Sequence, residues 1–189
     1  MTSKVKLIVP DAGPLIALGR GQVLDLLLAL EVPVYIVDQV AYETTKDLRF
    51  PDAVEIKRFI TEHVNEVHIV ETFVGSALAA RRAQGDTKRQ KGAGEAAAAE
   101  LFAGLDEFVG DADAPALMLF EDDDVLSKNM ILPKNVHLLS TTGLLFGLEK
   151  RGVIPSAEEV LKKINGSGRF PQMAQMDKPG EIGGLKTTW

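Results

Sequence analysis

Short apolar runs alternate along the chain with longer segments in which apolar residues recur at helical spacing. The runs are bounded by turn-forming or polar residues and predict strands at residues 5–9, 34–37, 67–70, 116–120 and 136–139. The longer segments predict helices at about residues 14–30, 39–46, 52–63, 73–84, 94–109, 142–151 and 156–164, with a short helix starting near residue 123. Strands that alternate with helices predict an α/β fold, a three-layer α/β/α sandwich around a parallel sheet of about five strands.

The regular pattern stops at residue 165. From there the C-terminal segment, residues 165–189, is interrupted by glycines and prolines and has no sustained apolar period. We therefore predict one folded domain over residues 1–164, followed by a flexible or partner-docked segment.

Composition narrows the class of protein. The chain has 189 residues, 46% of them hydrophobic and 25% charged, which suits one soluble domain. It has no cysteine, which excludes disulfide scaffolds, thiolate zinc sites and cysteine nucleophiles. The N-terminal apolar run is too short for a signal peptide, and no run approaches the roughly 18 to 20 apolar residues of a membrane helix. We expect a cytoplasmic protein that does not associate with a membrane.

The net charge of −6 argues at first against a nucleic-acid partner, because phosphate binding is largely electrostatic. The segment 76–92 is an exception, since it contains five basic residues and a single acidic one, Asp86. These side chains could follow an RNA backbone; alternatively, they form a solvated helix face and a mobile loop. The candidate RNA-binding residues are Arg81, Arg82, Lys88, Arg89 and Lys91.

Two aspartates closely follow predicted strands, where ligands of open parallel sheets gather. Asp11 follows the first strand and could instead be a turn former or helix N-cap. Asp122 follows the fourth strand within a run of four acids, residues 121–124. Their mutual repulsion favours a bound cation, and a solvated helix cap is the alternative. Within this run Asp124 is a weaker candidate ligand, whereas Glu121 and Asp123 are expected to point to solvent.

Two glutamates lie at the starts of predicted helices. Glu43 shares a helix face with Val40, so the helix can bury Val40 and still direct Glu43 along the sheet edge. Glu95 opens an alanine-rich helix, where it could simply complement the helix dipole. Each signal alone is ordinary helix chemistry, but with Asp11 and Asp122 the four acids fall on one expected rim. Carboxylate ligands favour a hard cation, Mg²⁺ or Mn²⁺.

These motifs occur in an order that resembles the PIN-domain nucleases, including VapC-type toxins of toxin–antitoxin pairs. The matching segments, over about residues 5–164, are Asp-Ala-Gly-Pro-Leu-Ile-Ala-Leu at 11–18, Val-x-x-Glu at 40–43, Gly-Ala-Gly-Glu-Ala at 92–96, Phe-Glu-Asp-Asp-Asp at 120–124 and Ser-Thr-Thr-Gly-Leu-Leu at 140–145. One departure is Phe120, which stands where the family commonly has threonine. A second is the long segment between Glu43 and Glu95.

The resemblance implies a PIN-like fold and a metal-dependent endoribonuclease that hydrolyses RNA phosphodiesters. Asp11, Glu43, Glu95 and Asp122 would be the catalytic, metal-binding residues, with Asp124 as a further ligand. It also implies a homodimer and an antitoxin partner protein. Thr141 and Thr142 begin a predicted helix, where they could hold a phosphate or cap that helix.

The same acidic residues allow two other hypotheses. A phosphatase with Asp11 as nucleophile usually needs a second aspartate two residues later, and this chain has Gly13 there. A non-catalytic PIN-like module that binds RNA or protein is the other alternative, which the net charge and Phe120 leave open.

Overall fold

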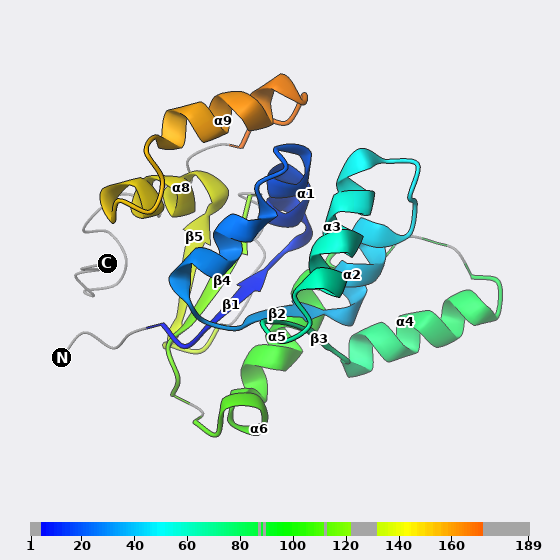
Figure 1. Cartoon of the computed structure of the whole chain (residues 1–189). Coiled ribbons are helices and arrows are strands. Elements are labelled where there is room, and N and C mark those ends of the chain that lie inside the picture. Colours follow the sequence, from blue (N-terminus) through cyan, green and yellow to red (C-terminus); the bar gives the residue numbers. More distant parts are fainter. Residues whose placement is uncertain (1–4, 87, 89, 112, 122–131, 172–189) are drawn as a thin grey trace.

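A five-stranded parallel sheet forms the centre of the molecule (Figure 1). This computed structural model describes residues 5–86, 88, 90–111, 113–121 and 132–171. The strands are β1 (Leu7–Pro10), β2 (Val34–Val37), β3 (Val67–Val70), β4 (Ala116–Phe120) and β5 (Val136–Ser140), in the order β3-β2-β1-β4-β5. Three of them have the predicted bounds, and the α/β sandwich prediction is confirmed.

Helices cover both faces of the sheet. The α-helices are α1 (Ala12–Arg20), α2 (Asp38–Thr45), α3 (Pro51–Glu62), α4 (Phe73–Ala83), α5 (Ala93–Ala103), α6 (Leu105–Val109), α8 (Thr141–Lys150) and α9 (Ala157–Gly166), and η1 (Leu24–Leu30) is a 3₁₀ helix. Helix α1 packs against α3, α8 and α9 on one face, and α5 packs against β2 on the other. In the described residues no single helix is long and apolar enough to span a membrane; α1 and η1 pass that test only together, with a bend of 116° between them.

The core lies on both faces of the central strands. Every residue of β1 and β4 is buried, as expected for parallel strands covered on both sides. Burial of these apolar side chains, at about 25 cal/mol per Å², drives the association of the layers. The carboxyl ends of β1 and β4 are therefore held rigidly, side by side.

The predicted helix at residues 14–30 is wrong in its second half. The chain leaves α1 at Gly21, where an added β-carbon would lie 2.6 Å from Ile164 Cγ1 of α9, and Gln22 then adopts a left-handed φ of 52°. Leu24, Leu27 and Leu30 are buried at a spacing of three residues, which is the period of a 3₁₀ helix. Close packing of α9 against Gly21 thus accompanies a break that the apolar pattern does not reveal.

The predicted helix at residues 94–109 is also two helices. Gly104 ends α5, and its N–H donates to the carbonyls of Glu100 and Leu101. A short helix, α6, follows and ends at Gly110, which has a positive φ of 68°. The turn at Gly104 allows Leu105 to be buried, with 1% of its surface exposed.

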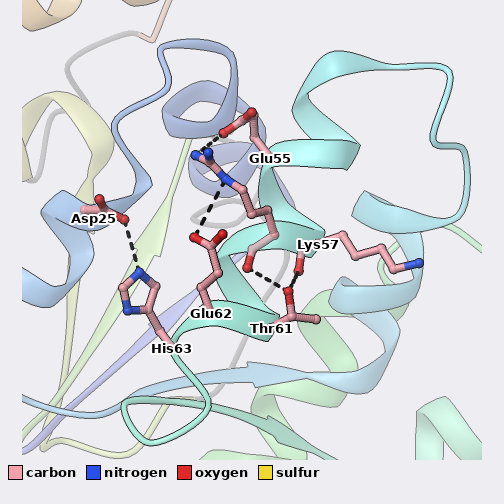
Figure 2. A network of polar contacts seen from close by, with 7 residues as sticks. Asp25, Glu55, Lys57, Thr61, Glu62 and His63 are labelled. Atoms are coloured by element: carbon pink, nitrogen blue, oxygen red, sulfur yellow. Dashed lines mark hydrogen bonds and ion pairs between the residues drawn. The ribbon is translucent and has the colours of Figure 1, made fainter.

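The outer face of α3 carries a network of polar contacts near η1 (Figure 2). Arg58 pairs with Glu55 at 2.6 Å and with Glu62 at 3.9 Å, and His63 lies 3.4 Å from Asp25 of η1. Each pair has at least one exposed side chain, so each contributes about 1 kcal/mol or less. The network is surface chemistry of α3, whose inner face supplies Ile56 and Phe59 to the core.

Helix α9 continues to Gly166, two residues beyond the predicted end of the domain. The chain then turns back, and residues 168–171 reach the carboxyl edge of the sheet, where they line a pocket. The rest of the predicted C-terminal segment, residues 172–189, lies outside the described residues.

Candidate active site

A pocket of about 640 Å³ opens beyond the carboxyl ends of β1 and β4. Strand order reverses between these two strands, because β2 and β3 extend the sheet on one side and β5 extends it on the other. Ligands of open α/β sheets bind at such a switch point. Four acids line the pocket, Asp11, Glu43, Glu95 and Glu121. The remaining lining residues are Ala12, Gly13, Ile16, residues 90–93 and residues 168–171.

Asp11 is held at the end of β1. Its N–H donates to the Leu119 carbonyl at 2.9 Å, which extends the pairing of β1 with β4 by one residue. Asp11 occupies the N-cap position of α1, but its side chain makes no capping hydrogen bond, so the predicted capping alternative is not observed. Instead, its Oδ1 lies close to the first turn of α5: a β-carbon added at Gly94 would be 3.3 Å away. Gly94 therefore lets α5 approach this carboxylate.

Glu43 lies on α2, where a buried glutamine contacts it. Gln39 Nε2 donates to Glu43 Oε1 at 2.7 Å, and Gln39 Oε1 accepts from Arg82 Nη1 of α4 at 3.1 Å. Only 5% of Gln39 is exposed. The Glu43 side chain, half-buried at the pocket wall, is thus connected to α4.

Glu95 lies in the first turn of α5, half-buried and facing the same pocket. The helix begins after Gly92, which has a positive φ of 79°, a conformation that favours glycine. This placement is compatible both with dipole stabilisation and with ligand binding. The structure thus places Asp11, Glu43 and Glu95 along one pocket, from the end of β1, from α2 and from α5.

Glu121 corrects a prediction, because its side chain does not point to solvent. It is only 7% exposed, accepts from the Thr141 hydroxyl at 2.8 Å, and pairs with Arg169 at 2.7 Å. It also packs on Gly13, where an added β-carbon would lie 3.0 Å from Glu121 Cβ. A second aspartate at position 13, as in a phosphatase, would therefore fit only if Glu121 moved. The sequence contains four consecutive acids and does not show that Thr141 and Arg169 would meet the first of them.

Arg169 is a pocket residue that the sequence prediction placed in the C-terminal segment. Its Nε and Nη2 both donate to Glu121 Oε2, at 3.1 and 2.7 Å. The pairing was not foreseeable from the sequence, because 48 residues separate the two side chains.

The two threonines at the start of α8 do not cap it. Ser140 is the capping residue, and its Oγ accepts from the Gly143 N–H at 3.0 Å. Thr142 is buried, and its hydroxyl donates to the Pro171 carbonyl at 3.4 Å. Thr142 thus contacts the C-terminal segment, and its predicted role in RNA binding stays a prediction.

The candidate RNA-binding residues differ in their surroundings: the two described arginines contact other side chains, and the two lysines are exposed. Arg81 binds Asp86 at 2.5 Å and Gln90 at 3.1 Å, whereas Arg82 lies over the Tyr42 ring, 3.7 Å from its centre. The Arg81 hydrogen bond, together with the Lys88 N–H, lowers the pKa of Asp86 from its usual 3.8. Both arginines are therefore engaged within the protein.

The two lysines of this set lie in the loop before α5. Lys88 and Lys91 are exposed, and Lys91 lines the pocket. Arg89 lies outside the described residues. The loop places at least one basic residue, Lys91, beside the three carboxylates.

The acids of the pocket have the chemistry of a divalent-cation site. The oxygens of Asp11, Glu43 and Glu95 are the kind of ligand that Mg²⁺ or Mn²⁺ prefers. Among the described residues, however, no three acids or histidines lie close enough together to hold an ion. The predicted ligands Asp122 and Asp124 lie outside the described residues. The donors fit in chemistry, and binding requires these side chains to move closer together or a further carboxylate to join them.

Comparisons with known proteins leave the family open. The chain matches no protein-family model, no curated protein and no solved structure. The resemblance to PIN-domain nucleases therefore stays a prediction that depends on the residues themselves.

Proposed function

We propose that the chain is a divalent-metal-dependent endoribonuclease that hydrolyses RNA phosphodiesters. One observation carries the proposal: Asp11, Glu43 and Glu95, from three separate elements, line a single pocket at the switch point of the sheet. Structural roles such as capping would place these acids at their own helices and would not require them to share a pocket. The order of the motifs, similar to that of PIN-domain nucleases, also supports it.

In this proposal five of the pocket residues have defined roles. Asp11, Glu43 and Glu95 hold the cation, which supplies Lewis acidity when bound. Lys91 and Arg169 place positive charge at the wall of the same pocket, where they can contact a substrate phosphate. Because acidic and basic groups share the pocket, it suits an anionic substrate that binds together with a cation.

The deciding experiment compares the wild type with Asp11→Asn. The purified full chain is incubated with a mixed RNA pool and either Mn²⁺ or Mg²⁺, and Mn²⁺ binding is measured in parallel by calorimetry. We expect metal-dependent cleavage by the wild type and a loss of at least about 100-fold in the variant, because a ligand of the cation is removed without a change in shape.

Two controls make the result specific. Asp113→Asn changes an exposed aspartate distant from the pocket and should leave cleavage unchanged. Circular dichroism must show that Asp11→Asn is folded. Cleavage that persists in Asp11→Asn, or that survives chelation of metals, would contradict the proposal.

The alternative is a non-catalytic module that binds RNA or protein. It is favoured by one observation: the described acids do not form a ready cluster of three around an ion. RNA binding without cleavage in either metal, with no Mn²⁺ bound, would support it. The antitoxin partner and the homodimer are expectations of the resemblance; a small DNA-binding protein encoded immediately upstream would support the former, and sedimentation would test the latter.

A further inference from the structure

Gln39 is a buried amide that lies between an acid of the pocket and an arginine of a neighbouring helix. On one side its Nε2 donates to Glu43 Oε1 at 2.7 Å, one turn further along α2. On the other its Oε1 accepts from Arg82 Nη1 at 3.1 Å. Gln39 is 5% exposed and its two partners are half-buried, so both hydrogen bonds are partly shielded from water and are costly to lose.

The chemistry of the two partners fixes the orientation of the amide. A guanidinium has only donors, so the amide oxygen must face Arg82. A carboxylate has only acceptors, so the amide nitrogen must face Glu43. A flipped amide would lose both hydrogen bonds at once. Gln39 therefore presents a donor to Glu43 in one fixed direction.

Arg82 is itself held in place. Its guanidinium lies 3.7 Å from the centre of the Tyr42 ring, a cation–π contact, and Tyr42 belongs to the same helix as Glu43. The N-terminus of α4 is also held in place, because Glu100 of α5 accepts from the Phe73 and Val74 N–H groups at 2.5 and 3.1 Å. The network thus connects Glu43 to α4 and, through α4, to α5.

We propose that Gln39 is a positioning residue that restricts the Glu43 carboxylate at the pocket wall and thereby favours binding of a divalent cation, with Arg82 fixing the Gln39 amide. The inference rests on the proposed metal-dependent function and assigns to Arg82 a role inside the protein. Residues that orient a metal ligand typically change metal affinity by about 10- to 100-fold when they are replaced. Gln39 can have such an effect because it already constrains Glu43. Without this contact the flexible glutamate would lose rotamer freedom when it binds the cation.

The test uses Gln39→Leu in the full chain. Leucine approximates the volume of glutamine and removes both hydrogen bonds. We expect Mn²⁺ affinity, measured by calorimetry, to fall by about 10-fold. Gln84→Leu, the same substitution at an exposed glutamine at the end of α4, is the matched control and should bind Mn²⁺ as the wild type does. Arg82→Met, in which the amide loses its fixed partner, should show a smaller decrease.

A double-mutant cycle separates positioning from a structural effect. If Gln39 acts through Glu43, replacing it in a Glu43→Ala background should not weaken Mn²⁺ binding further. A purely structural role would lower affinity equally in both backgrounds. Should Gln39→Leu not fold, the same cycle is run with Arg82→Met, which changes a partly exposed side chain.

The two proposals fail in different ways. If the wild type binds Mn²⁺ and cleaves RNA but Gln39→Leu binds Mn²⁺ equally well, the positioning role is wrong and the nuclease proposal stands. If the wild type binds no Mn²⁺ and cleaves no RNA, the nuclease proposal is wrong, and the positioning role, which depends on it, is wrong with it.

Discussion

At Gly75, in the first turn of α4, the Asp38 carboxylate occupies the space that any larger side chain would need. Asp38 accepts from the Thr72 hydroxyl at 2.7 Å and from the Thr72 N–H at 3.2 Å. The Thr72 hydroxyl in turn caps α4 by accepting from the Gly75 N–H at 2.9 Å. Absence of a side chain at one residue thus allows α2 to contact the start of α4, the helix that carries Arg82.

Replacing Gly75 with alanine should therefore displace Asp38. We expect Gly75→Ala to lower the free energy of unfolding by about 1 to 3 kcal/mol, the usual cost of overpacking. Gly147→Ala, in α8 where nothing lies within 4 Å of an added β-carbon, should raise it by up to about 1 kcal/mol because alanine favours helix. Chemical denaturation measures both. Equal stability of Gly75→Ala and wild type would contradict the close contact.

At the scale of elements, the loop between α4 and α5 is tied to α4 by one side chain. Arg81 binds Asp86 near the start of the loop and Gln90 near its end. Gln90 and Lys91 line the pocket, so this attachment sets where the pocket wall lies. Arg81, which the sequence predicts as an RNA contact, therefore also helps to position the neighbouring Lys91.

The Arg81 contact predicts a pH response of the loop. Because Arg81 holds the pKa of Asp86 below its usual 3.8, the contact adds stability above that pH and is lost as pH falls through the lowered value. Arg81→Gln should raise the pKa of Asp86 toward 3.8, as measured by carbon-13 NMR titration. Asp47, whose pKa Arg49 lowers to about 2, is an internal control and should not change. An unchanged Asp86 pKa would show that Arg81 does not hold it.

At the scale of the whole molecule, the pocket combines residues that follow the first strand with residues of the last described segment. Strand order places the end of β1 beside the end of β4, and residues 168–171 close the same region. Arg169 pairs there with Glu121, which is nearly buried, so the last described segment of the chain contacts the residue that follows β4.

A double-mutant cycle measures the coupling of this pair. We expect Arg169→Met and Glu121→Gln each to lower stability, and their combination to lower it by less than the sum, with a coupling of about 1 kcal/mol or more. Part of the Arg169 side chain is exposed, so solvent screening keeps the coupling free energy near the lower end of this range. Arg151→Met, at an exposed arginine after α8, serves as the control and should be nearly neutral. Strict additivity would mean that the pair contributes nothing to stability.

Periodicity alone determined the strands, the α/β class and the approximate helices. Strands β2, β3 and β4 were predictable because each is a short apolar run whose neighbours are strongly polar or turn-forming. Asp11 was predictable as a pocket residue for a related reason. It follows a buried strand directly, and the ends of parallel strands lie at one edge of the sheet wherever those strands fall in the order.

Tertiary structure alone decided which polar groups meet. The break at Gly21, the burial of Glu121 and the entry of Arg169 into the pocket all depend on partners 20 or more residues away in sequence. Local pattern carries information about neighbours within a turn or a strand, whereas these contacts arise only when the layers have packed. For the same reason Gln39, an unremarkable helix residue in the sequence, became a candidate positioning residue only when α4 brought Arg82 to its side.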